Sequence, residues 1–130
     1  PLAGRKEVSM GECTDFPLII PGENLSLRRV LDVAWARHVG GSPRAVAEVN
    51  SIGLIKSLTI HGAGLGWLTA FDALSEIEAG SLVFIPLADE RIDFSTLSIV
   101  SAAGRTLSVP ASLLIHHLGQ MMEEHGVPVV

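Results

Sequence analysis

The chain has 130 residues, of which 48% are hydrophobic and 18% are charged, and its formal net charge is −5. This length suits one modest domain. The acidic balance and the scattered positions of the nine basic residues exclude a basic stripe, so we expect no direct binding of nucleic acid by this chain.

Cysteine content and hydropathy bear on the compartment. Cys13 is the only cysteine, so no internal disulfide can form, and a reducing compartment fits. No apolar run approaches the roughly 20 residues that a membrane-spanning helix needs, and the first residues do not resemble a signal peptide. We therefore expect a cytoplasmic protein without membrane contact. The start at Pro1, within a loop-like stretch, suggests a fragment of a longer protein.

The first two thirds of the chain alternate apolar strand patterns with helical ones. FPLIIP predicts a strand at 16–21, which Pro21-Gly22 ends. A helix follows at 26–39, with Asn24 or Ser26 as its N-cap and its arginines mostly facing water. The further elements expected in this part are a strand at 44–49, a helix at 51–60, a strand at 65–69, a helix at 71–78 and a strand at 81–87.

The last third has fewer elements. Residues 88–94 are charged and loop-like, and 96–101 predict another strand. A helix from about Ser108 to Glu124 carries Pro110 in its first turn. Strands separated by helical segments predict an α/β fold with a mainly parallel sheet and helices on both faces.

The segment VNSIGLIKSLTIHGAGLGWLT, residues 49–69, is the most informative. A strand end, a short helix and a glycine-rich bend follow one another, an order typical of the mouth of a ligand site in an α/β fold. A dinucleotide-binding fingerprint is excluded, because Trp67 stands where the third glycine is needed and the run follows a helix.

Two expected helix N-termini follow strand ends, near Leu25-Ser26 and at Asn50-Ser51. Free amides and the helix dipole at such positions suit an anion, so the carboxylate of a small metabolite could bind at Ser51 and Ile52. The alternative is that these polar residues are ordinary helix caps.

The sequence offers little for catalysis. It contains no nucleophile motif, and Cys13 lies in a polar loop without a base partner. The histidines lack the spacing of metal ligands, since adjacent His116 and His117 point about 100° apart on a helix. His61 could face a ligand, although a helix-terminal histidine that bonds local carbonyls is the simpler interpretation. We therefore expect neither an enzyme nor a metal or cofactor.

Three segments carry a family likeness. PLAGRKEVSMGECTDFPLIIPGENLSLRRVLDVAWARHVG, NSIGLIKSLTIHGAGLGWLT and RTLSVPASLLIHHL resemble, in order and spacing, the latter half of the effector-binding domain of LysR-type transcriptional regulators. Trp67 and Ala70 depart from the family pattern, which often has a small aliphatic residue and a proline there.

The resemblance implies a Rossmann-like lobe of a type-2 periplasmic-binding-protein-like fold. Residues 12–90 are similar to the second lobe, and residues 95–125 are similar to the return segment of the first lobe. The resemblance also implies that the main part of the first lobe and the DNA-binding domain lie outside this chain, that DNA is contacted only through that other domain, and that effector domains pair as homo-oligomers.

The resemblance places effector contacts in three parts of the second lobe: the loop after the first strand, the N-terminus of the helix at 51–60 and the glycine bend. The residues concerned are Ile20, Pro21, Gly22, Ser26, Asn50, Ser51, Gly64, Leu65 and Gly66. The implied function is small-molecule sensing in a transcriptional regulator. The alternatives are a solute-binding protein of a transport system with the same fold and an oligomerisation fragment.

Overall fold

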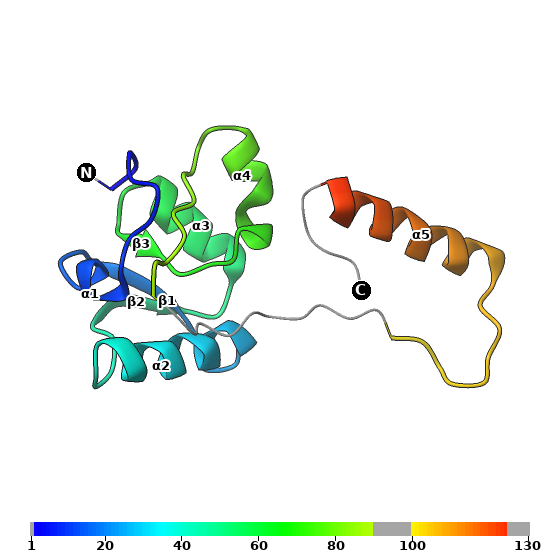
Figure 1. Cartoon of the computed structure of the whole chain (residues 1–130), viewed down its shortest axis with the longest axis horizontal. Helices are drawn as coiled ribbons and strands as arrows, with labels where there is room; N and C mark the ends of the chain where they lie inside the picture. The colour runs from blue at the N-terminus through cyan, green and yellow to red at the C-terminus, as the bar shows by residue number, and fades with distance from the viewer. Residues whose placement is uncertain (1, 90–99, 125–130) are drawn as a thin grey trace. The chain divides into compact units, whose positions relative to one another are not determined.

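The computed structural model describes residues 2–89 and 100–124. The chain divides into two compact units, residues 1–93 and 94–130. The sheet and the helices that cover it belong to the first unit (Figure 1), and the described residues of the second unit include helix α5, Val109–Glu124.

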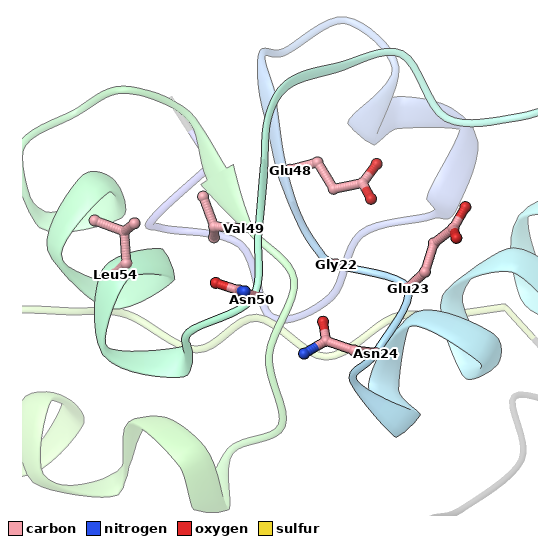
Figure 2. Close-up of a pocket in the computed structure, with 7 residues that line it drawn as sticks. All are labelled: Gly22, Glu23, Asn24, Glu48, Val49, Asn50 and Leu54. Atoms are coloured by element: carbon pink, nitrogen blue, oxygen red, sulfur yellow. The ribbon is translucent and has the colours of Figure 1, made fainter.

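The first unit is built on a three-stranded parallel sheet. The strands are β1 (Leu18–Pro21), β2 (Ala45–Val49) and β3 (Leu65–Gly66), in the order β2-β1-β3. Pro21 pairs with Val49, so the loops that follow β1 and β2 begin next to each other (Figure 2). The predicted α/β class with a parallel sheet is confirmed.

Helices cover both faces of the sheet. The helix α2 (Ser26–His38) lies on one side of β1, and α3 (Ile52–Ile60) lies on the other (Figure 1). Side chains alternate along a strand. Leu18 and Ile20 therefore point to one face and Ile19 to the other, where Ile55 of α3 is also fully buried.

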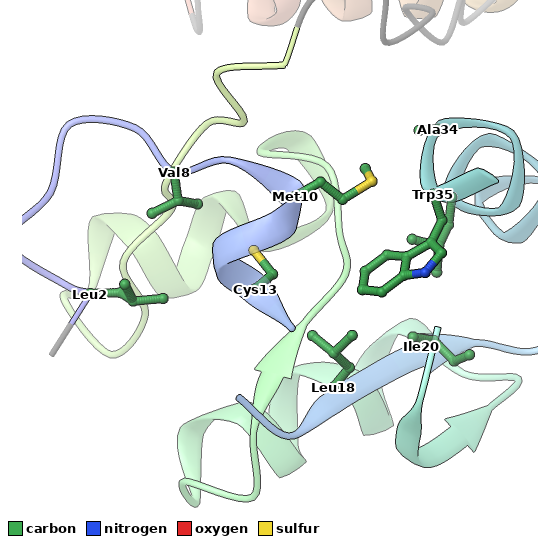
Figure 3. Close-up of a cluster of buried hydrophobic side chains, with 9 residues drawn as sticks. Leu2, Val8, Met10, Cys13, Leu18, Ile20, Ala34 and Trp35 are labelled. Carbon is green, nitrogen blue, oxygen red and sulfur yellow. The ribbon is translucent and has the colours of Figure 1, made fainter. Parts of the chain in front are cut away.

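The main core forms on the α2 side. Trp35 of α2 is 3% exposed, and its indole ring lies between Met10 and the β1 residues Leu18 and Ile20 (Figure 3). Fully burying one side chain of this size is worth several kcal/mol. The other members of this cluster are Leu2, Val8, Cys13, Leu31 and Ala34.

A short helix near the N-terminus escapes sequence-based prediction. The helix α1, Met10–Cys13, starts with a capping box in which the Ser9 side chain and Glu12 satisfy each other's backbone amides. Cys13 is buried in this helix and does not lie in a polar loop as expected. Burial, followed by the charge of Asp89, raises the pKa of the Cys13 thiol, which keeps it protonated.

Other elements agree with the predictions in kind but differ in length. The helix predicted at 71–78 is a 3₁₀ turn, η1 (Phe71–Ala73), followed by α4 (Leu74–Glu78). β3 is shorter than the predicted strand at 65–69. In α5, Pro110 occupies the first turn as predicted, and no residue of the helix is buried.

The strand predicted at 81–87 is wrong. This segment forms one parallel bridge, between Leu87 and Val8, flanked by hydrogen bonds from the Val8 amide to Pro86 and from the Ala88 amide to Val8. Val83 and Phe84 remain 59% and 42% exposed. An apolar run forms a strand only where a partner offers a matching edge. The strand predicted at 96–101 falls mostly outside the described residues.

Two glycines allow the backbone to approach its neighbours closely at β3. A Cβ on Gly64 would lie 2.9 Å from the carbonyl carbon of Pro17, just before β1. A Cβ on Gly66 would lie 2.9 Å from Cγ2 of Ile55. Gly64 therefore lets β3 pair with β1, and Gly66 lets α3 lie against β3.

Replacing Gly64 with alanine tests this packing role. We expect Gly64→Ala to lower the free energy of unfolding by about 1–3 kcal/mol, because rigid backbone must move to admit the methyl group. Urea denaturation followed by circular dichroism measures the change. The control is Gly53→Ala in α3, where the nearest contact of the new Cβ is Ser51 Oγ at 3.8 Å. The control should be neutral or stabilising, and an equal loss in both variants would contradict the assignment.

The capping box of α1 predicts an acidic titration. The Ser9 amide, then the Ser9 hydroxyl and then Arg5 lower the pKa of Glu12 from 4.5 to about 2. Because the pKa is lower in the folded chain, the stabilisation is present above pH 4.5 and is lost as the pH falls toward 2.

Carboxyl NMR titration should therefore place the Glu12 pKa near 2 in the native chain. Ser9→Ala should move it upward, whereas Ser42→Ala in an exposed loop should not. A native Glu12 that titrates at its ordinary value of 4.5 would refute this capping interaction.

Candidate functional site

The carboxyl edge of the sheet brings two polar loops together. The Gly22 amide donates to the Val49 carbonyl at 2.7 Å, which joins the end of β1 to the end of β2. The helix α2 begins at Ser26 and α3 at Ile52, so both helix N-termini follow the same edge. In open α/β sheets ligands bind outside the carboxyl ends of the strands.

A hollow of about 510 Å³ opens at this edge. Figure 2 shows its lining, which comes from the loop after β1, the end of β2 and the first turn of α3. The lining is mainly polar, with two carboxylates and two carboxamides, and Leu54 and Val49 add apolar surface. The lining residues are Gly22, Glu23, Asn24, Glu48, Val49, Asn50 and Leu54.

Gly22 and Asn50 are the two predicted site residues that line this hollow. Gly22 is buried against the other loop, and a Cβ there would lie 3.4 Å from Cβ of Asn50 and 3.1 Å from Oδ1 of Asn24. A side chain at position 22 would therefore crowd both carboxamides.

The other predicted residues do not line the hollow. Ile20 and Pro21 are buried in β1, whereas Ser26 and Ser51 are exposed at the starts of α2 and α3. Gly64, Leu65 and Gly66 are half-buried at the short strand β3, on the other side of β1 from β2.

The two helix starts are capped differently. Ser51 is the N-cap of α3 and accepts a hydrogen bond from the Leu54 amide at 3.4 Å, in agreement with its interpretation as a cap. The N-cap of α2 is Leu25, which makes no side-chain capping bond. The expectation that Asn24 or Ser26 caps α2 is therefore wrong, and the Asn24 carboxamide lies beside Gly22 in the lining of the hollow.

Arg28 also departs from expectation. The helical pattern places it facing water, but its side chain is 15% exposed. Its Nε donates to Asp32 Oδ1 at 2.8 Å, and its Nη1 donates to the Pro21 carbonyl at 3.2 Å and contacts Glu48 Oε2 at 3.0 Å. The hydrogen bond to Asp32, and after it the one to Glu48, raises the pKa of the guanidinium beyond its already high value.

Several lining residues escape prediction from sequence. Glu23 and Glu48 look like solvated surface charges, and only the pairing of β1 with β2 brings them to one hollow. Two features of the sequence could have indicated these contacts. Glu48 directly precedes the predicted strand end at Val49-Asn50, and Arg28 and Asp32 have the four-residue spacing of a helical ion pair.

Two of the histidines have contacts within the first unit. His61 is the C-cap of α3, and its Nδ1 lies 2.7 Å from the Ser57 carbonyl, which confirms the helix-terminal interpretation. His38 Nδ1 lies 3.6 Å from Asp89 Oδ1. Within residues 2–89 and 100–124, no group of three or more histidine, cysteine or acidic side chains is placed to hold a metal ion.

Among the helices that the structure describes, none combines the length and apolar character needed to span a bilayer.

Comparison with known proteins gives one match. The family model of the LysR substrate binding domain matches residues 1–123. No curated protein and no solved structure matches the chain. The family has a periplasmic-binding-protein-like fold, consistent with the parallel sheet and its covering helices, and it serves transcriptional regulators, not enzymes. The chain therefore belongs to the LysR substrate-binding domain family, the effector-binding module of LysR-type transcriptional regulators.

Proposed function

We propose that this chain supplies one wall of the effector cleft of a LysR-type regulator, at the hollow between the β1 and β2 loops. The observation that carries the proposal is the pairing of Pro21 with Val49, which sets two polar loops and two helix N-termini at one sheet edge. Gly22, Asn24 and Asn50 provide backbone and carboxamide groups for a small polar molecule.

A carboxylate on the effector would bind at the start of α3. The first-turn amides of Ser51 and Ile52 and the dipole of the nine-residue helix favour an anion there. Glu23 and Glu48 would repel an anion, so we expect them to accept hydrogen bonds from donor groups elsewhere on the effector. The site is thus divided into an anion-accepting end and a donor-accepting end.

The proposed lobe assignment explains why the hollow is open. Residues 12–90 form the second lobe and residues 95–125 the return segment, so the opposite wall belongs to a first lobe outside this chain. The apolar side chains of α5 support this division, because Val109, Leu113 and Leu114 are 74%, 63% and 58% exposed. A helix of this composition is normally covered.

Signal output would then be a change in quaternary structure. Effector binding closes the cleft between lobes and alters how effector domains pair as homo-oligomers. DNA would be contacted by a separate domain, in keeping with the net charge of −5. A transport protein with this fold would use the same cleft, but the family match favours the regulator.

Ligand binding by a longer protein that includes the first lobe tests this function. A thermal-shift screen with carboxylates from acetate to succinate should raise the melting temperature for at least one compound. The isolated 130-residue chain should respond weakly, because it has one wall of the cleft. For the best compound, Asn50→Ala should weaken binding about tenfold, the effect of losing one hydrogen bond to a charged group.

Ser57→Ala is the matched control, because it removes an exposed polar side chain nearer the opposite end of the same helix. Affinity should be unchanged in this variant. A folded longer protein that responds to no carboxylate would count against the carboxylate assignment, and unaltered binding by Asn50→Ala would count against the site.

A further inference from the structure

Arg28 links the ends of β1 and β2 at the sheet edge that forms the candidate site. From the first turns of α2 it reaches the Pro21 carbonyl at the end of β1 and Glu48 near the end of β2. Pro21 directly precedes the Gly22 to Asn24 part of the lining, and Glu48 is itself a lining residue. One side chain therefore bridges the two loops between which the hollow lies.

Two of the three guanidinium nitrogens of Arg28 bond to other groups of the chain. Nε bonds Asp32, and Nη1 serves both the Pro21 carbonyl and Glu48, while the whole side chain is 15% exposed. A guanidinium stays charged at every physiological pH and holds several acceptors in fixed directions. This arrangement suits a residue that orients its neighbours.

We propose that Arg28 is the positioning residue of this wall: it fixes the spacing of the β1 and β2 loops and holds the Glu48 carboxylate at the rim of the hollow. Without Arg28, Glu48 carries an unbalanced charge and is free to turn into solvent, since 47% of its side chain is exposed. The relevance to effector binding rests on the proposed function, whereas the positioning itself is a property of the unliganded chain.

Amide hydrogen exchange of the unliganded chain measures this positioning. The Gly22 amide, bonded to the Val49 carbonyl, reports opening of the two loops. Arg28→Gln should speed its exchange about tenfold, as expected when one charge-assisted link is lost. The amides of Leu31 and Ile55, which lie in fully buried parts of α2 and α3, should change little.

Two further variants separate positioning from general stability. Arg29→Gln removes the neighbouring exposed arginine and should leave Gly22 exchange unchanged. Arg28→Lys keeps the charge but has one donor group in place of the fork, so it should restore only part of the protection.

Glu48→Gln, alone and combined with Arg28→Gln, tests whether the arginine acts through Glu48. The double variant should exchange at Gly22 no faster than Arg28→Gln alone, because both changes break one link. The proposal would be overturned if the effects of Arg28→Gln and Glu48→Gln on Gly22 exchange were fully additive. It would also be overturned if Arg28→Gln accelerated exchange equally at Gly22, Leu31 and Ile55, or if its Gly22 exchange matched that of Arg29→Gln. None of these outcomes depends on effector binding, so they are distinct from a failure of the ligand screen.

Discussion

The burial of β1 on both faces is the constraint on which the first unit depends. Leu18 through Pro21 are all buried, because β1 lies between two parallel neighbours and between the helices α2 and α3. Parallel pairing requires each connection to return to the starting edge. The same requirement brings the loops after β1 and β2 together and creates the hollow at Gly22 and Asn50. The site thus follows from the packing of one strand.

Glycines and ion pairs further stabilise the packing around β1. Gly64 and Gly66 each allow a neighbouring backbone or side chain to approach more closely than a Cβ permits, and a Cβ on Gly22 would crowd Asn24 and Asn50. Around them, Arg28 links β1, α2 and β2, and Lys56 Nζ pairs with Glu76 Oε1 at 2.8 Å to link α3 and α4. The predicted site glycines at 64 and 66 thereby acquire a packing role at β3, whereas Gly22 belongs to the hollow itself.

Local sequence signals account for the elements with strong periodicity or clear ends. The FPLIIP run, the helical pattern at 26–39 and the Ser51 cap all predict what the structure contains. Local sequence signals fail where pairing between distant segments determines the structure. The run at 81–87 is apolar but meets a partner only at Val8, and α1 is too short to show a helical period. The helical pattern places Arg28 in solvent, because periodicity locates a Cα and does not show how far a long side chain reaches.

We propose that small molecules bind at the joined ends of β1 and β2. Chemical-shift mapping can locate the binding site in a longer protein that includes the first lobe, titrated with the strongest carboxylate from a ligand screen. We expect the largest amide shifts at Gly22, Asn50, Ser51 and Ile52, with the side-chain amides of Asn24 and Asn50 also moving. Shifts confined to residues remote from this edge, such as those of α4, with these signals unchanged, would contradict it.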